Sequence, residues 1–579
     1  MQKSSYRPHP VIPVSSAGES ILVGFDLIRS ELVNQLKTND VIAIETYPGT
    51  NKDVLVKNWV DIFDQIFDTD EAYLKGKELD TFLQSDLSDD RVYGHMSYKT
   101  IVDIRHPQRF DQLQKQIDEA KGKILLVGLG SSLFRKNAVT ILTSVSRWEI
   151  QMRFRSGASA NFNTDNYKED PLRMFKRGYF VDWRIADRHK ISIWSSVDFI
   201  MDTEDANLPK MLTKKAVDKI LSETAQKPFS MVPYFDPGLW GGKWMLERLN
   251  LPQDKPNYAW SFNGVPEENA ICFEFGQETF TLQAMDLVLF ESKKLLGPRT
   301  LARFGREFPI RFDFLDTMNG GNLSLQVHPV TDYIQRNFGM HYTQDESYYI
   351  LDADQDATVY LGVKTGAKME DLIEDLRVAS RNEKPFDDKR FINKIPAKKH
   401  DHFLIPAGTI HCSGTGSLVL EISATPYIFT FKLWDWGRVG MDGRPRPIHL
   451  DHAKEVIQID RDTEWVNAHL VNNTKLIHEE ERLQVESTGL HELEFIETIR
   501  TWFEKPFEIK TGNTVHMLML VEGSSILIKD PDHQFEDKLI HYAECFIVPA
   551  AVKRFIVEPL GKEKHAIVSA FVRSTKTNY

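Results

Sequence analysis

The stretch GGNLSLQVHP, residues 320–329, has the clearest strand pattern near the middle of the chain. Glycines open it, a proline closes it, and polar and apolar residues alternate between them. Successive side chains of a strand point to opposite faces, so the polar residues Ser324, Gln326 and His328 share one face. Such a face either borders water or lines a binding site, and the polar stripe taken alone favours water.

The sequence around this stretch, from residue 231 to residue 460, is typical of an all-β barrel or sandwich. Short apolar segments alternate with turn residues, as in such folds. One helical insertion is expected near residues 366–390, because KMEDLIEDLRVASRN places apolar residues at the spacing of one helix face. The expected strands are TLQAMDLVLF, FPIRFDFLD, NLSLQVHP, SYYILDADQDATVYLGV, DHFLIPAGTIHCSG and SLVLEISATPYIFTFKLWDW.

The C-terminal part of the chain repeats this pattern. HFLIPAGTIHCSGTGSLVLEIS is similar to CFIVPAAVKRFIVEPLGKEKHAIVSAF, with Pro406 matching Pro549. Both segments predict a strand, a turn centred on proline, and another strand. The second copy has Arg554 where the first has His411. We therefore expect residues 461–579 to form a second β domain without the site histidine, in a structural or ligand-shaping role.

Residues 1–230 predict an α/β domain with a mostly parallel sheet. The apolar runs VIAIETYPG and KGKILLVGLGSSLF are separated by helical patterns, as in such sheets. The stretch ETAQKPFSMVPYFDPGLWGG is rich in proline and glycine and predicts a boundary near residue 230. The chain is thus expected to be multidomain, with an N-terminal α/β domain followed by all-β domains.

The segment IETYPGTNKD follows a predicted strand and resembles a degenerate phosphate-binding loop. The working pattern G-x-x-x-x-G-K-[ST] uses glycine amides, a lysine and a hydroxyl to hold phosphate and magnesium. Here both required glycines are missing, Asp53 replaces the hydroxyl, and only Gly49 and Lys52 stay in register. With the basic segment at residues 162–190, this vaguely resembles uridine-kinase-like proteins. The alternatives are a degenerate, non-hydrolysing kinase-like domain and an unrelated α/β domain that positions or dimerises the rest.

Composition excludes several classes of function. The net charge of −12 argues against a general nucleic-acid binder, which would show a basic footprint. The three cysteines are far apart and form no disulfide framework, which fits a reducing, cytoplasmic setting. No apolar run approaches the ~18–20 residues that span a bilayer. We expect a soluble cytoplasmic protein that binds neither nucleic acid nor membrane.

Three segments of the first β domain each offer metal ligands. QVHP offers Gln326 and His328, DESYYIL offers Glu346 near the start of the next strand, and PAGTIH offers His411 after a turn. Two imidazoles, a carboxylate and a carboxamide suit a divalent metal such as zinc. A water completing the set is typical of a catalytic site. Spacing alone leaves open that these are unrelated polar residues.

Residues 230–460 resemble the class I mannose-6-phosphate isomerases, which are cupins with a jelly-roll fold. LWGGKW resembles the family's WGG segment, NLSLQVHP its LSVQVHP strand, and DESYYIL its KTExWYI strand. IPAGTIHCSGTGSLVLEI resembles its PxGTxHAxGxGxxxLEI hairpin, and FKLWDWGR and DGRPRPIHLDHA resemble the stretch that follows. The resemblance implies one zinc per chain and a phosphate contact for Ser324. It implies the metal ligands Gln326, His328, Glu346 and His411.

The resemblance also implies an activity, the interconversion of mannose 6-phosphate and fructose 6-phosphate through an enediol. A metal would offset the negative charge that develops on the substrate oxygens. The implied catalytic residues are Lys432, where relatives often have an arginine, and Arg438, which matches a second arginine. The proton carrier stays open between a metal-bound water, Glu421 and His341.

Two departures from the family pattern qualify this activity. Gln344 stands where many relatives have a lysine, and Lys432 lacks the bidentate fork of arginine. The alternative is therefore a non-catalytic or weakly active regulatory protein that binds a sugar phosphate. A nucleoside or sugar kinase is a third hypothesis, against which the broken phosphate loop argues. The sequence leaves the oligomeric state open.

Overall fold

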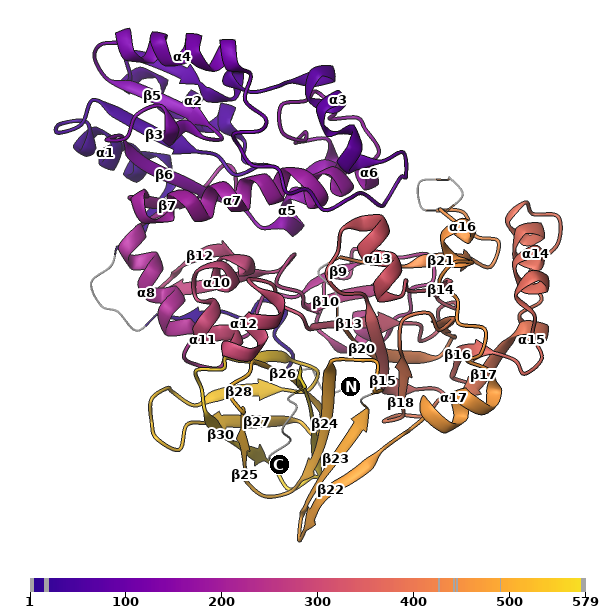
Figure 1. Ribbon diagram of the computed structural model, residues 1–579. Coiled ribbons are helices and arrows are strands. Elements are labelled where there is room, and N and C mark those ends of the chain that lie inside the picture. Colours follow the sequence, from indigo (N-terminus) through magenta and orange to yellow (C-terminus); the bar gives the residue numbers. More distant parts are fainter. Residues whose placement is uncertain are drawn as a thin grey trace. The chain divides into compact units, whose positions relative to one another are not determined.

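The computed structural model describes residues 5–14, 20–424, 427–440, 443, 446–489 and 491–573. The chain divides into two compact units (Figure 1). We call Val11–Glu223 with Ala270–Phe290 the α/β unit. We call Met1–Pro10, Thr224–Asn269 and Glu291–Tyr579 the β unit. The segment Ala270–Phe290, which lies within the predicted second domain, is thus part of the α/β unit.

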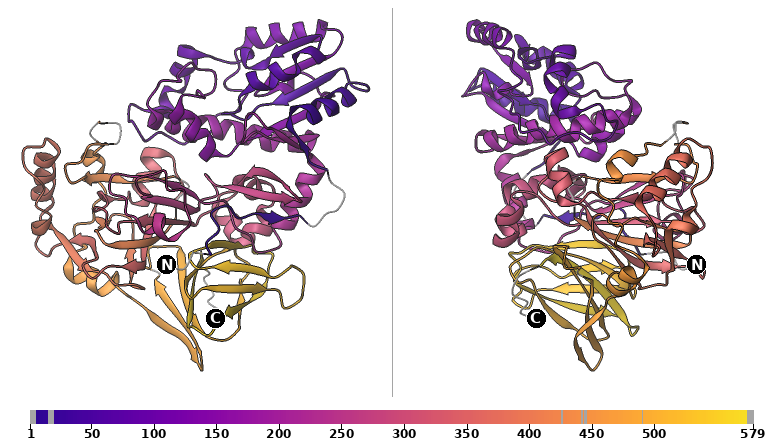
Figure 2. Two further views of the ribbon diagram at one scale, coloured as in Figure 1. Left: turned by 180° about the vertical axis from the view of Figure 1, so that it is seen from behind. Right: turned by 45° about the vertical axis from the view of Figure 1, so that its right-hand side comes forward.

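The α/β unit is built on a sheet of seven strands in the order β2-β8-β7-β6-β3-β5-β4. The central strands β4, β5, β3, β6 and β7 are parallel, and β8 runs antiparallel to β7 and β2. Helices cover both faces (Figures 1 and 2), so β3 and β5 are almost uninterrupted apolar runs. The strands are β2 (Leu22–Val23), β3 (Val41–Glu45), β4 (Gln65–Asp68), β5 (Ile124–Gly128), β6 (Val139–Ser144), β7 (Phe199–Asp202) and β8 (Lys210–Thr213).

The helices of this unit pack on the sheet through apolar residues at helical spacing. In α1, Ile28 and Leu32 are buried, and in α2, Leu55 and Trp59 are buried. The α-helices are α1 (Gly24–Gln35), α2 (Lys52–Trp59), α3 (Gly76–Leu87), α4 (Pro107–Glu119), α5 (Arg147–Ser156), α6 (Pro171–Arg177), α7 (Trp183–Ile193) and α8 (Lys214–Thr224). The expected α/β architecture of residues 1–230 agrees with this arrangement.

The segment Ala270–Phe290 adds a hairpin and a helix to the α/β unit. Strands β11 (Ala270–Phe275) and β12 (Glu278–Gln283) pair with each other, and β11 pairs with β1 (Ile12–Pro13). The stretch TLQAMDLVLF, predicted as one strand, is β12 followed by helix α10 (Ala284–Phe290). A short buried apolar run does not show by periodicity whether it is a strand or a helix, which explains the wrong prediction.

A buried ion pair anchors this segment to helix α7. The ammonium group of Lys190 donates to Asp286 at 2.7 Å and to the side chain of Gln283 at 2.8 Å. The side chains of Lys190 and Asp286 are only 2% and 3% exposed. Gln283 in turn donates to the carbonyl oxygen of Val145. The hairpin and helix are therefore part of the core of the α/β unit.

The first half of the β unit is an antiparallel sandwich of two sheets, in the orders β18-β15-β20-β13-β10-β9 and β17-β16-β19-β14-β21. The first sheet contains β9 (Tyr234–Asp236), β10 (Trp260–Gly264), β13 (Arg311–Asp316), β15 (Asp345–Ala353), β18 (His402–Ile405) and β20 (Ser417–Ala424). The second contains β14 (Leu325–Val327), β16 (Thr358–Val363), β17 (Ile392–Pro396), β19 (His411–Ser413) and β21 (Phe431–Trp434). The predicted helical insertion is present as α14 (Met369–Ser380) and α15 (Asp388–Phe391).

The second half of the β unit repeats this strand order. Its sheets run β22-β23-β24-β31-β26-β29 and β25-β30-β27-β28, so β26, β31 and β29 take the places of β15, β20 and β18. The interior is an apolar cluster that includes Phe503, Leu518, Phe546 and Phe555. The strands are β22 (Lys475–Glu480), β23 (Leu483–Gly489), β24 (Ile496–Phe503), β25 (Phe507–Lys510), β26 (His516–Glu522), β27 (Ser525–Lys529), β28 (Lys538–His541), β29 (Cys545–Val548), β30 (Arg554–Leu560) and β31 (His565–Val572).

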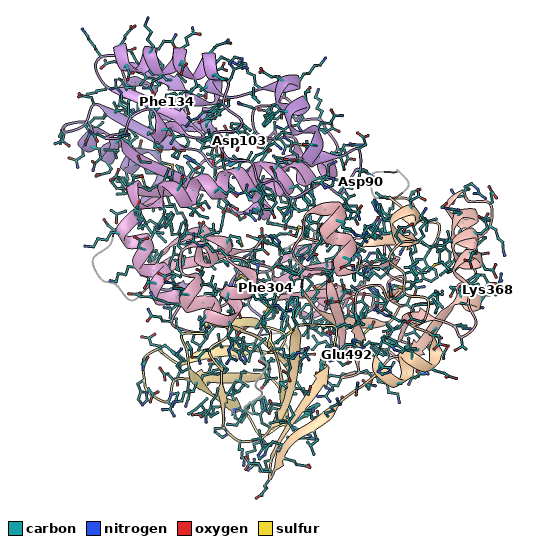
Figure 3. The ribbon with its side chains drawn as sticks, in the orientation of Figure 1. Asp90, Asp103, Phe134, Phe304, Lys368 and Glu492 are labelled. Atoms are coloured by element: carbon teal, nitrogen blue, oxygen red, sulfur yellow. The ribbon has the colours of Figure 1, made fainter. Side chains whose placement is uncertain are left out.

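Short helices connect and border the two sandwiches. Phe304, labelled in Figure 3, ends α12 and packs against the rings of Tyr342 and Phe495, with centroids 5.2 and 4.7 Å away. These contacts join residues from both halves of the β unit. The remaining helices are α9 (Trp244–Arg248), α11 (Ser292–Leu296), α12 (Pro298–Phe304), α13 (Thr331–Phe338), α16 (Leu450–Ala453) and α17 (Thr463–His469).

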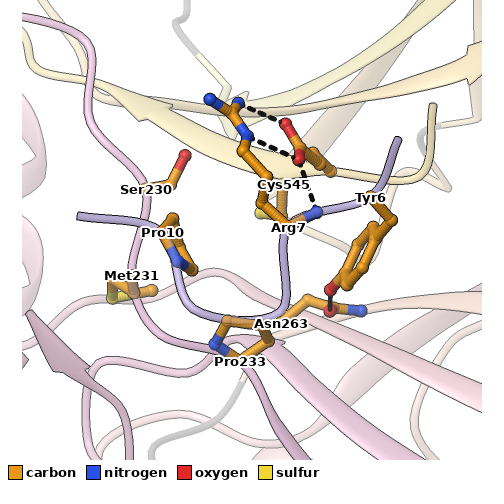
Figure 4. Close-up of a pocket in the computed structure, with 9 residues that line it drawn as sticks. Tyr6, Arg7, Pro10, Ser230, Met231, Pro233, Asn263 and Cys545 are labelled. Atoms are coloured by element: carbon orange, nitrogen blue, oxygen red, sulfur yellow. Dashed lines mark hydrogen bonds and ion pairs between the residues drawn. The ribbon is translucent and has the colours of Figure 1, made fainter. Parts of the chain in front are cut away.

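An N-terminal strap, residues 5–10, binds across the β unit (Figure 4). The guanidinium of Arg7 donates to both carboxylate oxygens of Glu544, at 2.9 and 2.6 Å, and the Arg7 amide donates to the same group. Tyr6 donates to Asn263 and packs edge-on against Phe235. The strap therefore links strand β10 of the first sandwich to the turn before β29 of the second.

Replacing Arg7 by alanine should lower the free energy of unfolding of the β unit by about 1–2 kcal/mol. The Glu544 side chain is 7% exposed and loses its cation, whereas Arg7 itself is 42% exposed, which reduces the effect. Urea unfolding measures the change. Arg381→Ala is the control, because Arg381 and its partner Glu383 are both more than half exposed. Equal destabilisation by the two variants would show that the strap adds no stability.

Candidate metal centre

Three buried side chains from both sheets of the first sandwich meet in its interior. His328 Nε2 lies 2.7 Å from one carboxylate oxygen of Glu346, and His411 Nε2 lies 3.5 Å from the other. All three candidate ligand atoms lie within 4.8 Å of one another. His328 follows β14, Glu346 is in β15 and His411 begins β19. We call these residues the metal triad.

Backbone carbonyls orient both imidazole rings. His328 Nδ1 lies 2.8 Å from the carbonyl oxygen of Phe429, and His411 Nδ1 lies 2.9 Å from that of Thr409. A carbonyl oxygen only accepts hydrogen bonds, so each Nδ1 carries a proton and donates it. When the ring is neutral, Nε2 holds the lone pair that a metal would accept, and when the ring is protonated, Nε2 donates to Glu346 instead. This arrangement is typical of metal-binding histidines, whose second nitrogen is fixed by an outer partner.

The electrostatics of the site keep Glu346 ionised. Burial favours its neutral form, but the charges and hydrogen bonds of His328 and His411 outweigh burial and hold the pKa of Glu346 well below its ordinary value. Burial also lowers the pKa of His411, which favours its neutral, ligating form. Gln344 donates to Glu346 at 3.0 Å and accepts from the amide of Phe429. Gln344 thus orients the carboxylate but adds no charge.

Gln326 completes the set that the sequence predicts. Its carboxamide nitrogen lies 3.2 Å from His411 Nε2, and a half-turn of the amide puts its oxygen in the same place. The neighbouring residues Leu325 and Val327 are fully buried on the opposite face, as the alternation predicts. The structure therefore brings all four predicted ligands together.

The residues present fit a divalent metal. Two imidazole nitrogens with free lone pairs, an ionised carboxylate and a carboxamide form a nitrogen and oxygen donor set of the kind that zinc takes. Within the described part of the chain, this is the one group of three or more His, Cys, Asp or Glu side chains whose ligand atoms approach so closely.

The predicted catalytic cations lie in and after strand β21. Lys432 is the cross-strand partner of Gln326, so both side chains extend from the same face of the sheet. Arg438 donates to the carboxylate of Asp435 at 2.6 Å. Ser324, the predicted phosphate contact, is buried and donates to the same carboxylate at 2.7 Å. Arg438 and Ser324 therefore belong to one polar cluster around Asp435.

Arg446 joins that cluster and was missed from the sequence. Its guanidinium lies 3.2 Å from Asp435 and donates to Ser324 at 3.3 Å. Two guanidinium groups thus face a single carboxylate, which leaves the cluster with a net positive charge suited to an anion. The signal in the sequence was the basic stretch GRPRP, which four residues separate from the WGR motif.

In the segment that resembles a phosphate loop, the groups that would bind a phosphate contact other residues of the chain instead. Lys52 binds Asp68 and Asp70, with nitrogen–oxygen distances of 2.7 and 2.5 Å. Asn51 caps helix α2 by accepting from the amide of Val54. Arg153 donates to the carbonyl oxygen of Gly49 at 2.9 Å. The lysine that would meet a phosphate therefore faces two carboxylates.

Comparison with known proteins gives relatives of one kind. Mannose-6-phosphate isomerase ManA of Bacillus subtilis (strain 168) is 24% identical over 336 residues, which cover 55% of this chain and 98% of that protein. The mannose-6-phosphate isomerase of Streptococcus mutans serotype c is 24% identical over 245 residues, 41% of this chain and 72% of that protein. The chain is therefore similar to mannose-6-phosphate isomerases over 41–55% of its length.

One solved structure and one family model also match the chain. The crystal structure of the mannose 6-phosphate isomerase from Bacillus subtilis has a TM-score of 0.49 and 19% sequence identity, and covers 60% of this chain and 99% of that one. Residues 24–226 match a family model described as "Domain of unknown function (DUF8485)". In the described residues, no helix has both the length and the apolar character needed to cross a membrane.

Proposed function

We propose that this protein is a metal-dependent aldose–ketose isomerase that interconverts mannose 6-phosphate and fructose 6-phosphate through an enediol. The observation that carries the proposal is the buried metal triad, in which two oriented imidazoles and an ionised carboxylate converge from two sheets. The similarity to curated isomerases, one of them over 98% of its length, supports the reaction and the substrate.

The proposed reaction moves a proton between adjacent carbons of an open-chain sugar, while negative charge develops on oxygen. A divalent metal such as zinc, held by the metal triad and Gln326, would supply Lewis-acid stabilisation of that charge. Lys432 shares the face of Gln326 and would add a cation near the same oxygens. Glu421 is the better placed proton carrier, because it is buried on the same sheet as Glu346, whereas His341 is exposed.

The cluster around Asp435 would hold the substrate phosphate. Arg438 and Arg446 present two guanidinium groups, which bind phosphate oxygens in a bidentate way. Ser324 adds a hydroxyl donor directly before β14, the strand that carries Gln326 and precedes His328. The phosphate and the reacting carbons of one substrate would thus be positioned by residues in or directly beside the same strand.

Metal analysis combined with an isomerase assay tests the proposal. The full chain, purified without chelator, should contain about one equivalent of a divalent metal per chain and convert mannose 6-phosphate to fructose 6-phosphate. Removal of the metal with a chelator should abolish turnover, and added zinc should restore it. A metal-loaded protein that is inactive on mannose 6-phosphate and on other hexose phosphates would refute the catalytic proposal.

A second candidate is a sugar-phosphate-binding regulatory protein with weak turnover or none. The observation that favours it is the low positive charge at the site, since Gln344 supplies no cation and Asp435 engages both arginines of the phosphate cluster. A rise in unfolding temperature with mannose 6-phosphate, without isomerisation, would support this candidate. Isomerisation at ordinary enzyme rates, with a kcat of about 1–1000 per second, would exclude it.

A further inference from the structure

The sheet behind the metal triad carries a row of polar residues on its inner face. Cross-strand pairing aligns Glu346 of β15 with Ser423 of β20, and Ser423 with Arg311 of β13. One step along, Tyr348 is aligned with Glu421, and Glu421 with Asp313. Because directly opposed residues share a face, all of these side chains extend to the side of Glu346. The residues Tyr348, Ser423, Asp313 and Arg311 are here called the polar row.

The polar row is buried, yet much of its hydrogen-bonding capacity is unused. Every member is at most 5% exposed. Arg311 donates through one terminal nitrogen to Asp313 at 3.2 Å. Tyr348 interacts electrostatically with Glu346, and Ser423 with Glu421, but in the part of the chain that the structure describes neither hydroxyl has a partner with good hydrogen-bond geometry. Among the described residues, no partner exists for Tyr348 Oη, Ser423 Oγ, Asp313 Oδ1, Arg311 Nε or Arg311 Nη1.

Unused polar groups at this depth are unfavourable for folding. A buried donor or acceptor without a partner costs about 1–3 kcal/mol, so native proteins keep few of them. In the polar row they are concentrated on neighbouring positions of one face, next to the metal triad. Such a concentration indicates that these groups bind something that the folded chain alone does not provide.

The second sandwich serves as an internal control for this interpretation. Glu346 pairs with the residue before Pro406, and His516 pairs with the residue before Pro549, so the two strands can be aligned. At this inner face, His516 bonds to Ser569 and to the carbonyl oxygen of Thr511. The counterparts of Tyr348, Asp313 and Ser423 are the apolar residues Leu518, Ile499 and Phe571, whereas that of Arg311 is Glu497. The architecture therefore does not require polar residues at three of the four positions.

The charges of the row select the class of ligand. Arg311 is a single cation, and it is near the carboxyl groups of Asp313 and Glu421, so a further anion is not favoured. The free groups include donors, Tyr348 Oη and two Arg311 nitrogens, and an acceptor, Asp313 Oδ1. A hydroxyl group both donates and accepts, so neighbouring sugar hydroxyls match such a mixed set.

We propose that the polar row is a subsite for the hydroxyl groups of an open-chain sugar bound at the metal triad. This inference rests on the proposed function, because it assigns the uncharged carbons of the same substrate to Tyr348, Ser423, Asp313 and Arg311. The phosphate end stays with Ser324, Arg438 and Arg446. The subsite selects polyhydroxylated chains over simple phosphate esters.

The test measures binding of mannitol 6-phosphate, an open-chain polyol phosphate without a carbonyl, to the zinc-loaded full chain by calorimetry. Tyr348→Phe should weaken this binding about tenfold and leave the affinity for inorganic phosphate unchanged, because one hydroxyl contact is lost. Its unfolding temperature should stay the same or rise, since the hydroxyl has no partner in the free protein. Wild-type affinity for mannitol 6-phosphate in Tyr348→Phe would overturn the proposal.

Two further variants make the result specific. Tyr349→Phe removes the neighbouring hydroxyl, which bonds to His400 at 2.8 Å, and should lower the unfolding temperature without changing mannitol 6-phosphate affinity. Ser423→Ala deletes one oxygen atom of the row and should weaken binding of mannitol 6-phosphate as Tyr348→Phe does. This variant still tests the subsite if Tyr348→Phe disturbs folding. Equal affinities in Ser423→Ala and wild type would also count against the subsite.

The binding experiment separates this inference from the proposed function. If the wild type binds mannitol 6-phosphate through Tyr348 but does not isomerise mannose 6-phosphate, the subsite stands and the catalytic proposal fails. If the wild type is an active isomerase and Tyr348→Phe binds the polyol phosphate normally, the function stands and the subsite fails. If the wild type binds inorganic phosphate but not mannitol 6-phosphate, the subsite fails.

Discussion

Replacing His328 by alanine is expected to remove the bound metal and to abolish isomerase turnover. The substitution takes one of two imidazole donors from a set whose remaining members are Glu346, His411 and Gln326. Loss of an outer partner already lowers metal affinity about 10–100-fold, and loss of a direct ligand should exceed the upper end of that range. We expect metal content to fall from about one equivalent to below about a tenth, and turnover to fall at least about a hundredfold.

Elemental analysis after gel filtration and the isomerase assay measure this result. His469→Ala is the control, because His469 is an exposed histidine at the end of α17, outside the metal triad. The variant should stay folded, since Gln344 still donates to Glu346. Full metal content in folded His328→Ala protein would show that the metal binds elsewhere.

Replacing Lys190 by methionine is expected to lower the free energy of unfolding of the α/β unit by about 3–5 kcal/mol. The methionine fills the space of the lysine stem but leaves the carboxylate of Asp286 buried without its cation. Breaking a buried ion pair by removing one partner has a cost of this size, because the other charge stays uncompensated. Urea unfolding followed by tryptophan fluorescence, to which the buried Trp59 and Trp183 of this unit contribute, measures the change.

Two companion variants test the reason for that loss. Lys190→Met with Asp286→Leu removes both charges and should recover most of the lost stability. Lys75→Met, in the same unit, removes the partner of Glu71 from a pair in which both side chains are about half exposed or more, and should change stability by less than about 1 kcal/mol. If the double variant is no more stable than Lys190→Met, the isolated charge is not the cause.

Much of the metal centre could be predicted from the sequence, because its ligands lie on short motifs with clear alternation. Gln326 and His328 share one face of a strand, and the motifs around Glu346 and His411 follow in a recognisable order. The order of the motifs indicated a binding site, whereas the alternation of polar and apolar residues alone favoured a strand face exposed to solvent. The distances that bring the four side chains together depend on the pairing of β14 with β19, which sequence alone does not show.

The polar row could not be predicted, although two of its residues, Arg311 and Asp313, alternate with phenylalanines in RFDFLD. Alternation shows that Arg311 and Asp313 share a face, but not whether that face is turned outward to water or inward to the site. The same limit applies to Asp286, which lies in a run that the pattern assigns to a strand. Its charge became interpretable only when the fold placed Lys190 beside it.

The interleaving of the two units sets conditions on folding during synthesis. N-terminal domains generally fold first as the chain is made. The α/β unit, however, is complete only when Ala270–Phe290 has left the ribosome, because Asp286, the ion-pair partner of Lys190, lies in that segment. Arg7 of the N-terminal strap can pair with Glu544 only after residue 544 has been synthesised. Some of the earliest residues to be translated must therefore stay available for some of the last.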